Sequence, residues 1–239
     1  MNIALIGYGR MGKEIEKIAL ERAHTIALII DQDNTSNLDT AHLKNIDVAI
    51  EFSSPQSAFS NYQRCFNNNV PVVSGTTGWL EQFHEIEEAC EKHQQTFFYA
   101  SNFSLGVNVF FEINKHLAEL MKPFSNYEVD VEEIHHTRKI DAPSGTAITI
   151  AEHILEHHNL KKEWELDTQS IDKLNITSKR IGDVPGTHTV KYESDIDTIE
   201  IKHQAKNRKG FALGAVLAAE FVKDKKGLFS MQDLLHLQH

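Results

Sequence analysis

The chain has 239 residues, with 24 Lys+Arg against 34 Asp+Glu and a formal net charge of −10. This length predicts one large domain or two smaller ones, and 41% hydrophobic with 24% charged residues is the composition of an ordinary folded protein. The acid excess argues against a nucleic-acid-binding protein, because contact with the phosphate backbone needs a basic face. It does not exclude a small anionic ligand, which responds to the local charge of its site.

The sequence also bears on cellular location. Cys65 and Cys90 have neither metal-pair spacing nor the pattern of a disulfide framework, and we interpret both as reduced thiols. No run approaches the ~18–20 apolar residues of a transmembrane helix. The N-terminus lacks the basic and apolar regions of a signal peptide. We therefore expect a cytoplasmic protein with no membrane partner.

The first hundred residues alternate between short apolar segments and segments with helical periodicity. Strands are predicted over residues 2–6, 25–30, 47–52, 70–73 and 96–100. Helices are predicted over residues 12–23, 55–67 and 79–93. Short apolar strands separated by helices indicate a parallel sheet that is covered on both faces. This part of the chain is therefore predicted to be an α/β domain with the doubly wound Rossmann architecture.

After Ser101 the pattern changes. Helices are predicted over residues 105–121, 145–157 and 212–222, and strands over 127–134, 176–181, 188–193 and 198–203. The polar stretch 159–174 is predicted to be an exposed connection, and the helix 212–222 to return to the first domain. Strands that follow one another without helices between them predict an α+β domain with a mixed sheet. We expect a nucleotide-binding domain of residues 1–106 and 209–239, and a substrate domain of residues 107–208.

The clearest local motif is a glycine-rich turn between the first strand and the first helix. It consists of Gly7, Tyr8, Gly9, Arg10, Met11 and Gly12. In the dinucleotide fingerprint the first glycine permits the tight turn, the second lets the pyrophosphate approach the backbone, and the third lets helix and strand pack closely. The helix N-terminus offers unpaired amides to the phosphates. A merely tight turn is the alternative, but the strand–turn–helix context favours NAD(H) or NADP(H) binding.

Asp31 ends the second predicted strand, 19 residues after Gly12. An acid at this place accepts hydrogen bonds from the ribose hydroxyls of NAD and repels the 2′-phosphate of NADP. Gln32 follows, and no arginine stands nearby in the sequence. Asp31 therefore favours NADH over NADPH, although it could also be an ordinary aspartate at a strand end.

Two further turns follow the next strands of the predicted parallel sheet. They are Gly75-Thr76-Thr77-Gly78 and Ala100-Ser101-Asn102-Phe103. Ligands of doubly wound sheets bind at the carboxyl ends of the strands. Both turns are therefore expected to face the nicotinamide half of the cofactor, although Gly-Thr turns alone are common.

The densest group of polar residues runs from Glu133 to Ala147. Two histidines, an arginine and a lysine lie between His135 and Lys139, in a chain that is acidic overall. Histidine and lysine can both transfer protons. Pro143, Ser144, Gly145 and Thr146 then begin a helix, whose amides suit an anion. The combination predicts a site for a small dicarboxylate.

Two other interpretations of this segment stay open on residue types alone. It could be a solvated basic loop. It could also be a zinc site, but His135 and His136 are adjacent and lack a partner four residues away or any cysteine. We predict that no metal is bound.

Several motifs together resemble the 4-hydroxy-tetrahydrodipicolinate (dihydrodipicolinate) reductase family. They are E-x-H-H-x-x-K-x-D-A-P-S-G-T-A at 133–147, the glycine fingerprint at 7–12, G-T-T-G at 75–78, and further segments at 102–108, 182–188 and 203–215. The resemblance covers nearly the whole chain. The nucleotide loop is one residue shorter than in many members of the family.

The resemblance implies a set of residue roles. The residues Gly7 to Gly12 with Asp31 would hold the adenosine and pyrophosphate of NADH or NADPH, and Gly75 to Thr77 with Ala100 to Phe103 would line the nicotinamide. His135 would be a proton donor or acceptor and Lys139 a second proton donor, while His136, Gly145 and Thr146 would bind the substrate carboxylates. The family also implies a homotetramer built through the sheet of the substrate domain.

Three other functions stay in view. A different Rossmann reductase of a small acid, such as an amino-acid dehydrogenase, would not explain the paired histidines. A regulator that senses NAD(H) without turnover would not need His135 and Lys139 beside an anion site. A lyase with a Schiff base on Lys139 would leave the dinucleotide fingerprint unexplained.

Overall fold

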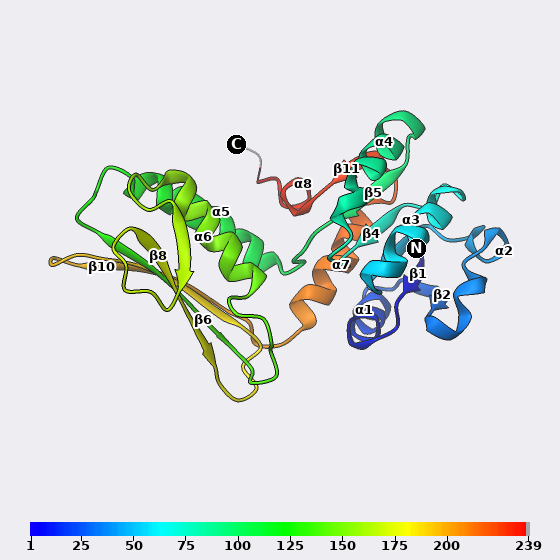
Figure 1. The fold of residues 1–239 in the computed structure, drawn as a ribbon. Coiled ribbons are helices and arrows are strands. Elements are labelled where there is room, and N and C mark those ends of the chain that lie inside the picture. The colour runs from blue at the N-terminus through cyan, green and yellow to red at the C-terminus, as the bar shows by residue number, and fades with distance from the viewer. Residues whose placement is uncertain (238–239) are drawn as a thin grey trace. The chain divides into compact units, whose positions relative to one another are not determined.

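In a computed structural model, which describes residues 1–237, the chain forms two compact units. The first unit contains Met1–Leu105 and Lys209–His239, and the second contains Gly106–Arg208. The expected nucleotide-binding segment 209–239 thus extends two residues beyond the described part. Figure 1 labels most of the helices and strands along the chain.

The first unit is built on a six-stranded sheet in which all pairs are parallel. Its strands are β1 (Asn2–Ile6), β2 (Thr25–Ile30), β3 (Val48–Glu51), β4 (Val72–Ser74), β5 (Thr96–Tyr99) and β11 (Gly227–Phe229). Their order is β11-β5-β4-β3-β1-β2. Every residue of β3 is buried, as expected for a strand that is covered on both faces. The predicted Rossmann-like α/β architecture is confirmed.

Helices cover both faces of this sheet. They are α1 (Arg10–Glu21), α3 (Pro55–Phe66), α4 (Phe83–His93) and α7 (Lys209–Val222), with the short α2 (Thr40–Leu43), α8 (Met231–Leu235), η1 (Gln32–Asn37) and η2 (Leu80–Gln82). Helices α1 and α7 lie side by side and share one apolar core with the sheet (Figure 1). Helices α3 and α4 contribute to a second core on the other face.

The strand order places a topological switch point between β1 and β3. The chain moves from β1 outward to β2, then returns to β3 on the other side of β1. In open parallel sheets the crevice outside the carboxyl ends of two such strands is where ligands bind. The glycine-rich turn follows β1 directly, so the fold places it at this crevice.

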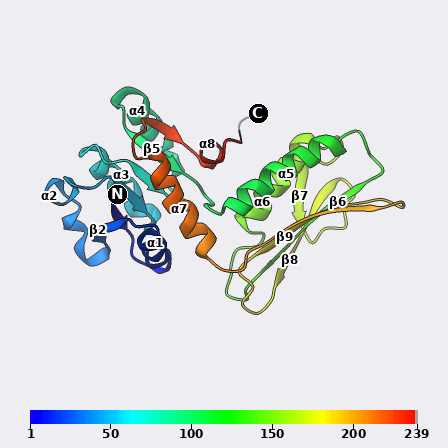
Figure 2. The same cartoon turned by 180° about the vertical axis from the view of Figure 1, so that it is seen from behind.

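The second unit is a five-stranded mixed sheet with two long helices. Its elements are α5 (Leu105–Met121), β6 (Glu128–His135), α6 (Gly145–His157), β7 (Glu163–Leu166), β8 (Lys173–Arg180), β9 (Thr187–Glu193) and β10 (Thr198–Gln204). The strand order is β10-β9-β6-β8-β7, with β9 antiparallel to both of its neighbours and the other pairs parallel. Figure 2 shows α5 and α6 together over one face of this sheet, where they bury an apolar core. The predicted mixed sheet is confirmed.

Several elements differ from the sequence-based expectation. The stretch 159–174 contains the strand β7 and is not only a connection, and the chain continues past α7 into β11 and α8. Strand β8 begins at Lys173 and not at 176. Strands β7 and β11 are only four and three residues long and lie at sheet edges. Such short edge strands carry too little apolar periodicity to be recognised.

Both cysteines are free and buried in the first unit. Burial raises the pKa of the Cys65 thiol to about 12 and that of Cys90 to about 11. Neither thiol is therefore ionised near neutral pH. Within residues 1–237, no helix combines the length and the apolar character that crossing a membrane requires.

Candidate active site

The turn after β1 is shaped by close backbone contacts. Gly7 has φ +91°, and a Cβ there would lie 2.0 Å from the carbonyl oxygen of Phe52, which follows β3. A Cβ on Gly12 would lie 2.3 Å from the carbonyl oxygen of Gly7. Both positions therefore need glycine, the first for the turn at the switch point and the second for packing α1 against the turn.

Gly9 differs from its neighbours, because a Cβ there would meet nothing within 4 Å. It is the N-cap residue of α1, and no side chain caps the helix. The first-turn amides thus face open space that a ligand can approach, which fits a pyrophosphate. Arg10 beside it is exposed, while Met11 packs against the apolar core. The Tyr8 hydroxyl donates to Glu16.

Asp31 directly follows β2 and organises the turn after it. Its carboxylate accepts a hydrogen bond from Gln32 N at 2.9 Å, and its own N–H donates to Asn34 Oδ1 at 2.6 Å. Asp31 is exposed. Arg64 on α3 donates to the carbonyl of Thr35 in the same turn, at 2.8 Å. Sequence reasoning found no arginine near Asp31, because 29 residues separate Arg64 from Thr35.

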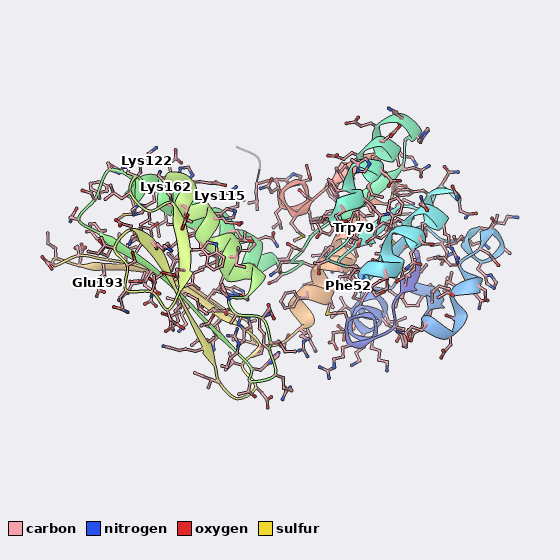
Figure 3. All side chains as sticks on the ribbon, in the orientation of Figure 1. Phe52, Trp79, Lys115, Lys122, Lys162 and Glu193 are labelled. Atoms are coloured by element: carbon pink, nitrogen blue, oxygen red, sulfur yellow. The ribbon has the colours of Figure 1, made fainter. Side chains whose placement is uncertain are left out.

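The turn after β4 is fixed by hydrogen bonds and an aromatic ring. A Cβ on Gly75 would lie 2.2 Å from the Phe52 ring, so this position also needs glycine. Thr76 is buried, and its hydroxyl accepts from Ser53 N at 2.9 Å. Its carbonyl accepts from Trp79 Nε1 at 2.7 Å. Phe52 and Trp79, both labelled in Figure 3, thus shape the turn that presents Thr76, and Thr77 beside it is exposed.

The segment Ala100 to Phe103 after β5 is only partly open to a ligand. Phe103 is buried, with its ring 5.8 Å from that of Phe98 in the core. Ala100 is also buried. Ser101 is exposed, and Asn102 Oδ1 accepts from Ser104 N at 2.9 Å. The side chains of Ser101 and Asn102, and the backbone of the segment, are therefore what this turn can offer to a cofactor.

Sequence reasoning missed a buried acid beneath these turns. Glu51, the last residue of β3, has no exposed surface. Its carboxylate accepts from Ser53 N at 3.2 Å, Ser74 Oγ at 3.0 Å and Tyr62 Oη at 3.3 Å. The acid thereby links the turns after β3 and β4. The sequence did contain one indication of this buried acid, because Glu51 is a charged residue at the end of an otherwise apolar strand.

In the second unit the polar group begins where β6 ends. His135 is the last residue of β6, and Ser144 is the N-cap of α6, where its hydroxyl accepts from Ala147 N at 3.2 Å. Gly145 and Thr146 form the first turn of α6, and a Cβ on Gly145 would meet nothing within 4 Å. The helix start thus keeps space beside its amides, as an anion site requires.

Glu133 lies under this helix start with no exposed surface. Its Oε1 accepts from Ser144 N at 3.1 Å, Ser178 Oγ at 2.6 Å and Arg180 Nη2 at 3.0 Å. Its Oε2 lies 2.9 Å from His135 Nδ1. Burial acts to raise the pKa of Glu133, but His135 and the three donors outweigh it and hold the pKa well below the usual range. Glu133 is therefore ionised.

His188 on β9 completes this buried group. Its Nε2 lies 3.3 Å from Ser144 Oγ and 3.9 Å from Glu133 Oε2. Burial lowers the pKa of His188 to about 3, and His135 acts in the same direction against the opposing charge of Glu133. His188 is therefore neutral at neutral pH.

The geometry also bears on metal binding. One ligand atom each from Glu133, His135 and His188 lies within 4.8 Å of the others. This group contains His135 but not its neighbour His136, so the adjacent histidines are not brought together as ligands. Because Arg180 already contacts the Glu133 carboxylate, a cation there would have a positive neighbour. These contacts favour a hydrogen-bonded cluster over a metal centre.

The basic residues after β6 are partly neutralised. Lys139 Nζ donates to both oxygens of Asp141, at 2.7 and 2.8 Å. Arg138 pairs with Asp183 at 2.7 Å. Burial acts to raise the pKa of Asp141, but the hydrogen bond and charge of Lys139 lower it overall. His136 is half-buried.

A polar groove of the second unit lies on the face of its sheet opposite to Glu133 and His135. Asp130, Thr177, Lys191 and Glu200 are among its lining residues. Along β6 this face alternates with the one that carries Glu133 and His135. The groove therefore contains none of the predicted site residues.

The comparisons with known proteins cover both units. Residues 1–103 match the profile described as "Dihydrodipicolinate reductase, N-terminus", and residues 106–235 match "Dihydrodipicolinate reductase, C-terminus". A Christiangramia forsetii protein named 4-hydroxy-tetrahydrodipicolinate reductase is 56% identical over 235 residues, which cover 98% of each chain. A protein of the same name from Thermosipho africanus is 34% identical over 237 residues, again 98% of each chain.

Solved structures show the same fold. A dipicolinate-bound dihydrodipicolinate reductase from Paenisporosarcina sp. TG-14 has a TM-score of 0.76 at 23% identity, over 96% of this chain and 97% of that one. A probable dehydrogenase from Thermotoga maritima has a TM-score of 0.60 at 11% identity, over 98% and 92%. With profile matches to both halves and a relative at 56% identity, the chain belongs to the dihydrodipicolinate reductase family.

Proposed function

We propose that this chain reduces 4-hydroxy-tetrahydrodipicolinate to tetrahydrodipicolinate with NADH or NADPH, a step of diaminopimelate and lysine biosynthesis. The observation that carries the proposal is the joint presence of a glycine turn at the switch point of a parallel sheet and a histidine beside an open helix start. The name of the 56% identical relative supports the same reaction.

The cofactor would bind to the first unit. The fingerprint turn supplies the open helix start at Gly9, which suits the pyrophosphate. Asp31 is exposed at the end of β2, where a ribose would lie in this fold. The turns from Gly75 to Thr77 and from Ala100 to Phe103 would line the nicotinamide. Asp31 favours NADH, whereas Arg64 near the same turn offers a positive charge to a 2′-phosphate.

The dicarboxylate substrate would bind to the second unit. Gly145 and Thr146 present the first-turn amides of α6, and His136 lies on the chain that leads to them. Lys139 can bind a carboxylate in place of Asp141, because an ion pair with a largely exposed partner contributes only about 0–1 kcal/mol. A positive side chain and an open helix start thus become available to the two carboxylates of a dianion.

The chemistry needs one hydride and one proton. Loss of water from C4 of the substrate gives a conjugated imine, and NADH or NADPH, when bound, would supply the hydride that this carbon requires. The electron pair displaced toward the ring nitrogen requires an acid. His135 and Lys139 are the two groups of this chain suited to deliver the proton, which typically accelerates such a step by ~10²–10⁴-fold.

We also propose that the protein is a cytoplasmic homotetramer. The family resemblance supports the assembly and places it on the five-stranded sheet, whose outer face carries the polar groove. Light scattering coupled to size-exclusion chromatography tests the assembly directly. A monomer at micromolar concentration contradicts it.

The reaction is tested by coupling the protein to dihydrodipicolinate synthase and following the absorbance of NADH and, separately, NADPH. Oxidation that depends on both the synthase and this protein supports the reductase. Folded protein that binds NADH but oxidises neither cofactor would identify a nucleotide sensor and would falsify the proposed reaction.

A further inference from the structure

We propose that Glu133 is a positioning residue, which orients the His135 ring for proton transfer and joins it to the start of α6. This inference rests on the proposed function. It concerns a residue that does not itself meet the substrate, because the Glu133 side chain has no exposed surface.

The two oxygens of Glu133 have different partners. Oε1 accepts from Ser144 N, Ser178 Oγ and Arg180 Nη2, at 3.1, 2.6 and 3.0 Å. These contacts come from the helix start and from β8, so they hold the carboxylate from two sides. The other oxygen, Oε2, lies 2.9 Å from His135 Nδ1. The carboxylate is therefore a fixed anion that faces one ring nitrogen.

A fixed anion at this distance selects the protonation state of the ring. An ionised carboxylate can only accept a hydrogen, so the contact attracts when Nδ1 carries a proton and repels when Nδ1 carries a lone pair. Glu133 Oε2 and His135 Nδ1 lie 2.9 Å apart and neither has another hydrogen-bond partner within residues 1–237, so each is the nearest polar group available to the other. With the proton on Nδ1, Nε2 of His135 is the nitrogen that gains and loses a proton.

The surroundings keep Nε2 accessible. Gly186 lies beside it, and a Cβ at this position would come within 3.1 Å of Nε2. Glycine therefore leaves room at the nitrogen that must exchange a proton. The ring itself is about one-tenth exposed, so a proton donor or acceptor must approach from a defined direction.

The charged and titratable groups around the Glu133–His135 pair come from several elements. Arg180 on β8 and His188 on β9 lie beside the Glu133 carboxylate, and the His188 ring is also 5.2 Å from the His135 ring. His203 on β10 and Lys139 in the loop after β6 act on His188, and Asp141 in the same loop is paired with Lys139. Glu133 is the acid that faces His135 Nδ1, so a neutral group in its place removes the charge that favours a proton on that nitrogen.

The same carboxylate aligns the substrate site. Ser144 is the N-cap of α6, and its backbone N–H donates to Glu133. One side chain thus fixes the proton-transfer histidine relative to the helix start with Gly145 and Thr146. A loss of alignment would raise the KM for the dicarboxylate and lower kcat, whereas NADH binding by the first unit would not change.

The test is Glu133→Gln, which keeps the shape and removes the charge, with Glu132→Gln as the matched control. Glu132→Gln makes the same change at the neighbouring residue of β6, whose side chain lies on the other face of the sheet and pairs with Lys179. Three measurements are made on both variants and on the wild type: kcat and KM by the synthase-coupled assay, the pH profile of kcat/KM, and ¹⁵N NMR of the His135 ring. All are run with and without EDTA.

We expect Glu133→Gln to lower kcat by about 10–100-fold, part of the range available to acid–base catalysis. Its pH profile should move to lower pH and its His135 ring should lose the preference for a proton on Nδ1, while Glu132→Gln stays within a few-fold of wild type. Unchanged ring NMR and pH profile in a folded Glu133→Gln variant overturn the proposal and leave the reductase function standing. Loss of wild-type activity in EDTA also overturns it, because the cluster would then be a metal site. The NMR result requires no turnover, so it separates this inference from a failure of the proposed reaction.

Discussion

Replacing Gly214 by alanine should destabilise the first unit far more than the same change at Gly210 in the same helix. Helix α7 crosses the Phe103 backbone so closely that a Cβ on Gly214 would lie 1.8 Å from the Phe103 carbonyl oxygen and 2.9 Å from its carbon. At Gly210 the nearest atom to a new Cβ is Ser104 Oγ, at 3.9 Å. Both variants therefore add one methyl group to the same helix, and they differ only in the space that the methyl group finds.

The magnitude follows from that overlap. Real Cβ atoms are essentially never found closer than 3.0 Å to such neighbours, so α7 would have to retreat by more than about 1 Å. Overpacking of this kind costs about 1–3 kcal/mol or more, and the retreat would loosen the fully buried Ala215, Ala218 and Ala219. Alanine gains up to about 1 kcal/mol over glycine in a helix. Because the overlap is with backbone and is severe, we take the upper end of the cost, about 3 kcal/mol. The expected net loss for Gly214→Ala is then about 2 kcal/mol, or about 4–8 °C in Tm.

The assay uses the two tryptophans of the chain, one in each unit. In a Trp164→Phe background, the fluorescence of Trp79 reports the unfolding of the first unit. Phe103 belongs to the predicted nicotinamide segment, so NADH affinity should also weaken in Gly214→Ala and not in Gly210→Ala. A Tm for Gly214→Ala equal to or above that of Gly210→Ala would refute the close approach of α7 to Phe103.

Three further predictions concern cofactor choice, catalysis and acid stability. Asp31→Ser should raise the kcat/KM ratio of NADPH to NADH by about tenfold, equivalent to ~1.4 kcal/mol, because the repelling charge is lost while serine can still cap the turn; an unchanged ratio removes Asp31 from cofactor selection. Lys139→Ala should lower kcat by about 10²–10⁴-fold with NADH affinity intact, measured by the coupled assay and by fluorescence titration; a normal kcat excludes Lys139 as the proton donor. Burial holds the pKa of folded His188 at about 3, below the 6.5 of a free histidine. Between these two pH values the unfolded state therefore binds more protons than the folded state. The free energy of unfolding accordingly falls as the pH falls. In urea titrations from pH 7 to pH 5, His188→Gln should reduce the change in the free energy of unfolding by up to about 1.4 kcal/mol per pH unit. The same change at the exposed His116 is the control and should leave that pH dependence as it is. Equal pH dependence in both variants contradicts the buried neutral state of His188.

The architecture was predictable because the central strands are buried on both faces. Such strands must be apolar throughout, as β3 is at Val48, Ala49 and Ile50, and this leaves a clear pattern in the sequence. The edge strand β7 has the sequence EWEL, with only one partly buried side chain, Trp164, so no pattern marks it. Predictability therefore declines from the centre of each sheet toward its edges.

The candidate site was predictable only where its residues are contiguous. The run from His135 to Thr146 is recognisable because its polar residues follow one another in the sequence. Ser178, Arg180 and His188 come from other strands and are brought to Glu133 by the strand register. Parallel pairing with β8 places Ser178 opposite Glu133, and antiparallel pairing with β9 places His188 opposite it. Register depends on the connections and on both strands together, and no single segment reports it.

One signal for Glu133 was nevertheless present in the sequence. The alternation of β6 puts Val129 and Val131 on the face toward the core, and continuing it by two residues at a time puts Glu133 and then His135 on the same face. An acid at a core position is costly unless it is paired, so its presence there indicates a buried partner. The histidine two residues later is the nearest candidate along the strand. An acid can thus interrupt the apolar alternation of a strand just before a candidate catalytic histidine. Such an acid is itself a candidate for positioning that histidine.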